Sequence, residues 1–190
     1  TWFWPDIQPD LQALVDALGI PSFEQHEAGD MLTERSAAYP PGRINAYASS
    51  PPSWRLAGGM GALIATIRDR LPADKLISGF RVTRVAHLEN FIEITAEDTQ
   101  GNQLAHRVAQ VLLAVPPRLA ISTITFTPAL PQTIAMQWQS CGTWMAPHAK
   151  YVAVFDRPFW RKHGLSGGVR SSVGPMVEIH DASPEYDAGA

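Results

Sequence analysis

Apolar residues recur every three or four positions in three stretches of the chain, at 9–18, 58–71 and 130–138. This spacing places them on one face of a helix. Pro9 lies in the first turn of the first stretch, where proline is tolerated because backbone N–H groups there have no hydrogen-bond acceptor within the helix. Gly19 follows the last turn, a position that favours glycine. The pattern therefore predicts three helices.

Short apolar runs and two-residue alternation predict strands elsewhere in the chain. The expected strands lie at 75–88, 91–97, 108–115, 149–155 and 175–180. The nearly continuous apolar run at 108–115 is typical of a strand covered on both faces. Residues 98–102, Asp-Thr-Gln-Gly-Asn, predict a hairpin turn. Together these elements predict an α+β fold with a mixed or antiparallel sheet and about three helices.

Proline and glycine interrupt the pattern at two places. Residues 24–55 carry four prolines and a serine pair, which predicts a long ordered loop with one or two short strands. Gly164, Gly167 and Gly168 predict a glycine-rich turn before the last strand. We therefore expect mostly irregular backbone at both places.

Composition narrows the classes of partner. The 190 residues have a formal net charge of -3, which offers no basic surface to nucleic acid, and no apolar run is long enough to span a membrane. Cys141 is the single cysteine, so no internal disulfide can form, and we expect a reducing, cytoplasmic environment. The aromatic start without an initiator methionine, at residues 1–5, indicates a fragment of a longer protein.

Two common kinds of site do not match the sequence. The six histidines and one cysteine lack the spacing of a metal site, so we expect no bound metal. The run Gly58-Gly59-Met60-Gly61 lacks the spacing of a dinucleotide-binding loop and does not clearly follow a predicted strand. We interpret it as a tight turn before a helix.

Lys150 is one of three lysines, beside twelve arginines, and it lies within the apolar run 149–155. An ammonium buried in such a strand loses its hydration, so its pKa falls or it finds a partner. The residues alone leave two interpretations open. Lys150 is either a functional amine in a site, or a structural lysine that protects an edge strand or pairs with an acid such as Asp156.

Glu178 and His180 lie two residues apart on the last predicted strand and therefore share one of its faces. A polar strand face near the end of a domain is often exposed to solvent. The alternative is that this face lines a polar substrate cavity. Both interpretations stay open at this point.

Several segments, in chain order, resemble the flavin-dependent amine oxidases, the monoamine and polyamine oxidase superfamily. The resemblance covers most of residues 1–18 and 53–183, and the ordered set is more specific than any one motif. The segments are Thr1-Trp2-Phe3-Trp4-Pro5 with the helix that follows, Ala57-Gly58-Gly59-Met60, Val82-x-x-Val85 with Ile92 and Ile94, Leu112-Leu113-Ala114-Val115-Pro116-Pro117, Phe126-x-Pro128-x-Leu130-Pro131, Ala149-Lys150, and Pro158-Phe159-Trp160-Arg161.

The resemblance implies a place beside FAD for five residues. Lys150, on a buried strand, would hydrogen-bond a water at the flavin N5 atom and act as the catalytic lysine. Val82 would touch the adenine moiety through its backbone. Ala114 and Pro116 would run beside the FAD, and Trp2 would lie near the start of the flavin-binding region.

The resemblance also implies a substrate and a reaction. Glu178 and His180 would line the substrate cavity near its entrance, where their polarity would suit a cationic or hydrogen-bonding small amine. The implied reaction is oxidation of that amine, with a hydride equivalent passing to flavin N5 and reoxidation by O2 or another acceptor. Two alternatives stay open: an enzyme that dehydrogenates carbons, such as a desaturase or porphyrinogen oxidase, and a non-catalytic module that binds a ligand or partner.

Finally, the resemblance implies what residues 1–190 lack, because the family's N-terminal phosphate loop and its C-terminal flavin-closing segment are absent from them. We expect residues 1–190 to be a single substrate-binding domain, in which 1–20 and 75–118 would pack on missing FAD-binding segments of the same protein. Such a fragment would bind FAD poorly or not at all and would be inactive. Its uncovered flavin-facing surface would favour self-association.

Overall fold

The computed structural model describes residues 2–143 and 147–185. Thr1, at the start of the resemblance, and residues 186–190, at the end of the expected domain, lie outside the described residues. The chain forms two compact units, unit 1 from residues 1–73 and 152–190 and unit 2 from residues 74–151. Our expectation of a single substrate-binding domain stays a prediction beside this division.

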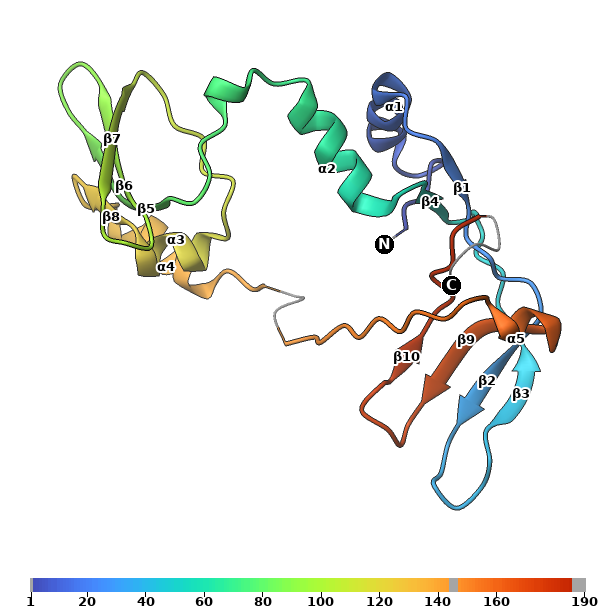
Figure 1. Ribbon diagram of the computed structural model, residues 1–190. Helices are drawn as coiled ribbons and strands as arrows, with labels where there is room; N and C mark the ends of the chain where they lie inside the picture. Colours follow the sequence, from blue (N-terminus) through green and yellow to red (C-terminus); the bar gives the residue numbers. More distant parts are fainter. Residues whose placement is uncertain (1, 144–146, 186–190) are drawn as a thin grey trace. The chain divides into compact units, whose positions relative to one another are not determined.

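Unit 1 contains two sheets (Figure 1). In the smaller sheet, β1 (Ser22–Glu24) pairs antiparallel with β4 (Trp54–Leu56). The larger sheet has the order β10-β9-β2-β3. Its β2 and β9 run parallel and its outer pairs run antiparallel, and its strands are β2 (Asp30–Glu34), β3 (Gly42–Asn45), β9 (Leu165–Ser171) and β10 (Glu178–Ile179).

The helices of unit 1 are α1 (Pro9–Leu18), α2 (Gly59–Asp69) and the four-residue α5 (Phe159–Lys162). α1 ends as predicted, because Gly19 adopts a left-handed conformation with φ 68° and donates its N–H back to the last turn. The apolar faces of α1 and α2 meet β4 in one core, built from Phe3, Val15, Leu18, Ile20, Leu56 and Leu63.

Unit 2 is a four-stranded sheet with the order β7-β6-β5-β8 and two helices that pack on each other (Figure 1). The strands are β5 (Arg81–His87), β6 (Ile92–Glu97), β7 (Gln103–Val108) and β8 (Thr125–Thr127), and the helices are α3 (Pro117–Thr123) and α4 (Gln132–Ser140). β5, β6 and β7 form an antiparallel meander, and β8 pairs parallel with β5. A short 3₁₀ helix, η1 (Ala73–Lys75), precedes the sheet in the chain.

The predicted α+β class with a mixed sheet is confirmed, and the three predicted helices correspond to α1, α2 and α4. The hairpin turn at 98–102 is also confirmed, because the Asp98 carboxylate accepts hydrogen bonds from the backbone N–H groups of Gln100 and Asn102. The sequence did not reveal α3, α5 or most of the short strands between residues 22 and 56.

Four expectations about local structure were wrong. The run at 108–115 forms a strand only at Val108, because the residues after it have no pairing partner, and Leu112 is 93% exposed. Residues 149–155 likewise form no strand. Gly167 and Gly168 lie within β9 rather than in a turn. The Gly58 run does follow a strand, β4, although β4 pairs antiparallel with β1 and so makes no dinucleotide-binding β-α-β unit.

No helix among the described residues has both the length and the apolar character needed to cross a membrane. In the same residues, no group of three or more His, Cys, Asp or Glu side chains could hold a metal ion.

Candidate functional site

A pocket of about 190 Å³ opens in unit 1 beside the β10-β9-β2 part of the larger sheet. Its wall combines carboxylates, imidazoles, hydroxyls and one guanidinium with a few apolar side chains. The polar members are Gln25, His26, Glu27, Tyr47, Ser49, Ser166, Arg170, Glu178, His180 and Asp181. This mixture suits a small polar ligand that is oriented by hydrogen bonds and charge.

Glu178 and His180 both line this pocket. The Glu178 carboxylate forms an ion pair with the Arg170 guanidinium at 2.8 Å, and His180 Nε2 lies 3.4 Å from the same carboxylate oxygen. Arg170 faces Glu178 directly across the β9–β10 pair, so its charge compensates that carboxylate. The two residues that the sequence placed on one strand face therefore share a pocket, and their role toward a substrate stays a prediction.

Trp2 belongs to the same neighbourhood. Its ring lies edge-to-face against the His180 imidazole, with 4.7 Å between the ring centroids and an angle of 68° between the planes. The structure thus brings together one residue predicted to lie near the flavin and one predicted to line the substrate cavity.

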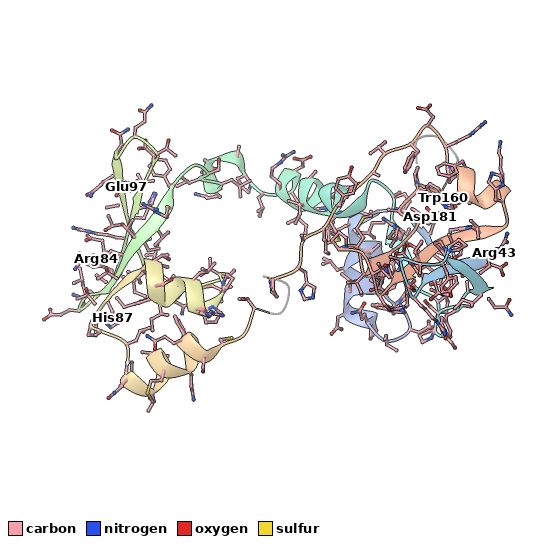
Figure 2. All side chains as sticks on the ribbon, turned by 90° about the horizontal axis from the view of Figure 1, so that it is seen from below. Arg43, Arg84, His87, Glu97, Trp160 and Asp181 are labelled. Carbon is pink, nitrogen blue, oxygen red and sulfur yellow. The ribbon has the colours of Figure 1, made fainter. Side chains whose placement is uncertain are left out.

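Asp181, on the pocket wall, fixes the segment that follows β10. Its side chain is buried, and its Oδ2 atom accepts hydrogen bonds from Trp160 Nε1 at 2.9 Å and Arg161 Nε at 2.8 Å, while Oδ1 accepts one from the Ser183 N–H at 2.8 Å. Figure 2 shows Trp160 and Asp181 next to each other. Burial pushes the Asp181 pKa upward, but the hydrogen bonds, led by the one from Arg161, outweigh it and hold the pKa below its usual value.

The Asp181 backbone is tied as firmly as its side chain. Its carbonyl accepts hydrogen bonds from Gln25 Nε2 at 2.8 Å and from an Arg55 guanidinium nitrogen at 3.1 Å. Burial lowers the pKa of Arg55, and the charge of Asp181 partly offsets this effect. We name the group of Asp181, Trp160, Arg161, Gln25 and Arg55 the Asp181 clamp.

The Asp181 clamp was not predicted from the sequence, although two of its five members, Trp160 and Arg161, lie in a segment that carries the family resemblance. The clamp joins residues of α5 and β4 with Gln25, which follows β1, and with Asp181, which lies two residues after the end of β10. An aspartate directly after the predicted strand at 175–180, in a chain with a Trp-Arg pair, was the available signal.

Glu27 was missed as well, because it lies in the stretch that was expected to be a loop. Its carboxylate accepts hydrogen bonds from the Ser49 N–H at 2.5 Å, from Ser49 Oγ at 2.5 Å and from Ser53 Oγ at 3.4 Å. Ser53 is buried, and Glu27 itself is half-buried on the pocket wall. Three neutral donors therefore fix the position of a charged group that faces the pocket.

Ser166 also lines the pocket, within the run Gly164-Leu165-Ser166-Gly167-Gly168 that has the spacing of a nucleophile elbow. A nucleophile elbow needs a strand-to-helix turn, whereas Ser166 lies inside β9. Its hydroxyl donates to the Asp30 carbonyl and accepts from the Gly168 N–H. The residue therefore has a structural place in the sheet.

Lys150 lies outside this pocket, in an exposed segment without regular secondary structure. Its apolar neighbours are exposed too, Tyr151 by 80% and Val152 by 73%. Lys150 is therefore not buried in an apolar strand, although its sequence context predicted this. Its catalytic role is supported only by the family resemblance and stays a prediction.

Comparison with known protein families identifies the family of the chain. The model of the family described as flavin containing amine oxidoreductase matches residues 22–187. The chain belongs to this family.

Two curated proteins are similar to the chain. It is 30% identical over 180 residues to a putrescine oxidase of Kocuria rosea, which covers 84% of the chain and 37% of that protein. It is 28% identical over 149 residues to a probable flavin-containing monoamine oxidase A of Dictyostelium discoideum, covering 70% of the chain and 32% of that protein. The chain thus spans about a third of the length of these curated relatives.

Solved structures share the fold. A wild-type putrescine oxidase bound to putrescine superposes with a TM-score of 0.76 at 19% identity, covering 99% of this chain and 62% of that one. Cyclohexylamine oxidase from Brevibacterium oxydans superposes with a TM-score of 0.74 at 14% identity, covering 100% of this chain and 62% of that one. At these identities the likeness establishes the fold alone.

Of the residues that were expected to contact FAD, Val82, Ala114 and Pro116 belong to unit 2 and Trp2 to unit 1, and their role toward the cofactor stays a prediction. Ala114 and Pro116 are exposed on an irregular segment of unit 2, and Val82 is half-buried in β5 of the same unit. Among the described residues, no glycine-rich turn within a parallel β-α-β unit offers backbone N–H groups to a pyrophosphate.

Proposed function

We propose that this chain is the amine-binding part of a flavin-dependent amine oxidoreductase, and that the full-length protein oxidises small amines. The observation that carries the proposal is the family match over residues 22–187, which spans nearly the whole chain. A relative that is 30% identical over most of this chain is a putrescine oxidase, which favours an amine as the substrate over a carbon-dehydrogenation substrate.

The pocket of unit 1 supports the substrate half of the proposal. A small alkylamine is protonated near neutral pH, as a lysine side chain is, and carboxylates favour such a cation within a few ångströms. Glu27 and Glu178 supply carboxylates on the pocket wall, and Tyr47 and His180 add hydrogen-bonding groups. We propose that this pocket binds the amine.

FAD is the cofactor that we propose for the full-length protein, held largely by segments outside residues 1–190. When bound, it would accept the electrons that are removed from the amine. We also propose a cytoplasmic location, since the single exposed cysteine suits a reducing compartment.

A screen of small amines against the full-length protein tests the proposal, with an artificial electron acceptor as the readout so that the natural acceptor need not be known. We expect turnover with at least one aliphatic or aromatic amine and none with matched alcohols. A protein that carries flavin but reduces the acceptor with no amine would contradict the proposal.

Replacing Lys150 by methionine tests its proposed catalytic role in the full-length protein. If the ammonium serves the flavin, Lys150→Met slows amine turnover by more than about tenfold, or about 1.4 kcal/mol in activation free energy, while the flavin absorbance of the purified enzyme stays. Lys162→Met is the matched control, because Lys162 is exposed on α5. Equal turnover of the two variants would leave Lys150 without a catalytic role.

The isolated chain of residues 1–190 is expected to be colourless when purified. Among the described residues no glycine-rich turn within a parallel β-α-β unit is present to hold a pyrophosphate, so we expect no flavin to remain bound through gel filtration. An absorbance spectrum of the purified chain checks this, and a yellow sample with a flavin spectrum would show that these residues bind the cofactor after all.

A further inference from the structure

We propose that Gln25 is a positioning residue that holds two parts of the pocket wall together and thereby sets the width of the amine that the protein accepts. One part of the wall is the segment after β1, with His26, and the other is the segment after β10, with His180 and Asp181. The inference rests on the proposed binding of an amine in this pocket, and it adds a residue that determines specificity there.

The side chain of Gln25 connects these two parts of the wall directly. Its Nε2 atom donates hydrogen bonds to the His26 carbonyl at 3.1 Å and to the Asp181 carbonyl at 2.8 Å. Its Oε1 atom accepts one from an Arg55 guanidinium nitrogen at 3.1 Å. Gln25 and Asp181 are 156 positions apart in the chain, so a single amide group joins distant segments where they line the pocket.

The partners of Gln25 require a primary amide at this position. The two carbonyls can only accept hydrogen bonds and the Arg55 guanidinium can only donate, so one side chain must offer two N–H donors and an oxygen acceptor together. A glutamate would place an oxygen against both carbonyls. An aliphatic residue would leave all three groups without this partner, so neither replacement reproduces the connection.

The segment after β10 depends on such contacts because β10 is short. The strand has two residues, and His180 follows the last residue that pairs with β9. The next residue, Asp181, is held to α5 through its carboxylate and to Gln25 and Arg55 through its carbonyl. Without the Gln25 amide, the carbonyl side of this attachment is weakened, and the His180 segment is able to move away from the segment after β1.

Replacement of the Gln25 side chain should leave the fold in place. The Gln25 backbone N–H donates to the Ser53 carbonyl at 2.8 Å, and an Arg55 guanidinium nitrogen reaches the Asp181 carbonyl at 3.1 Å. Both contacts are made without the Gln25 side chain. The spacing of the two wall segments, rather than folding, is therefore the property that this side chain controls.

The test compares Gln25→Met with wild type in the full-length flavin-loaded protein, using n-hexylamine and cyclohexylamine, which have the same carbon number but different widths. Methionine keeps the length of the side chain and removes its three hydrogen bonds. We expect kcat/KM for cyclohexylamine, divided by kcat/KM for n-hexylamine, to rise by about fivefold or more. The physical reason is that a loosened wall admits the ring and packs less well against the slender chain.

This ratio separates positioning from a purely structural role. A loss of stability alone would reduce the amount of active enzyme equally for both amines and would leave the ratio unchanged. Gln139→Met, which changes an exposed glutamine of α4, is the matched control and should also leave the ratio unchanged.

A second variant keeps the test decisive if Gln25→Met folds poorly, as judged by flavin content and melting temperature. In Gln25→Glu the carboxylate keeps its contact with Arg55, which favours the ionised form, but its other oxygen repels the two carbonyls. We expect the same shift toward cyclohexylamine, because the added charge acts equally on two amines that each carry one positive charge. An unchanged ratio in whichever variant folds would overturn the role of Gln25 while amine oxidation itself stands. If the wild-type protein oxidised no amine, the proposed function would fall, and this role with it.

Discussion

Replacing Gly167 by alanine lowers the free energy of unfolding of the protein by about 3 kcal/mol, on our account, because two costs add. Gly167 lies in β9 with a φ of +80°, which costs an L-residue about 1–2 kcal/mol. A Cβ atom there would also lie 2.7 Å from Trp160 Nε1 and 2.8 Å from Asp181 Cβ. Relief of that overlap displaces the Asp181 clamp, at a cost of about 1–3 kcal/mol.

Gly19→Ala is the matched control, because Gly19 has a similar φ of +68° but nothing within 4 Å of the position of a Cβ. Gly19→Ala should lower the free energy of unfolding by about 1 kcal/mol, which is the conformational cost of an L-residue at a positive φ. Urea denaturation of the full-length protein, followed by tryptophan fluorescence, measures both values. Equal losses for the two variants would show that the contact with Trp160 and Asp181 is unimportant.

Replacing Asp181 by asparagine is expected to lower the free energy of unfolding by about 3 kcal/mol. This is the lower end of the range for breaking a buried ion pair, because the Asp181 side chain is 1% exposed but that of Arg161 is 21% exposed. The amide keeps the size of the carboxylate but removes the negative charge that faces the Arg161 guanidinium. The effect should depend on pH. Since the Asp181 pKa is lower in the folded protein, its contribution is complete above the unfolded value of about 3.9 and is lost as the pH falls through the folded pKa.

Asp69→Asn provides the comparison for Asp181→Asn. The Asp69 carboxylate is paired with Arg68 at 2.9 Å, but both side chains are more than 60% exposed, and such a pair contributes about 0–1 kcal/mol. Denaturation of both variants near neutral pH gives the two values. The clamp would lose its assigned importance if Asp181→Asn were no more destabilising than Asp69→Asn.

Three helices, α1, α2 and α4, could be predicted from the sequence because their signals are local. The apolar period of α1, its proline at the start and its glycine at the end all lie within about a dozen neighbouring residues. The strands that were missed, such as β1 and β4, have three residues each and pair across about thirty residues of chain. The runs at 108–115 and 149–155 have the composition of strands, but apart from Val108 they pair with no strand among the described residues. Composition alone does not show whether a pairing strand is present.

The site was predicted only in part for the same reason. Glu178 and His180 were found because a period of two in one short strand puts both on one face. Glu27 and the partners of Asp181 were not predicted because these contacts join distant parts of the chain: Gln25 reaches Asp181 over 156 positions, and Ser49 reaches Glu27 over 22. The identity of a carboxylate's partner, and so whether its charge is compensated, depends on tertiary contacts that no local pattern encodes.

The most direct test of the central claim is anaerobic titration of the flavin-loaded full-length protein with a small α,ω-diamine, followed by flavin absorbance. If the chain is the amine-binding part of a flavin-dependent amine oxidoreductase, the amine bleaches the oxidised flavin. A flavin that stays oxidised in the presence of every amine tried would contradict the account.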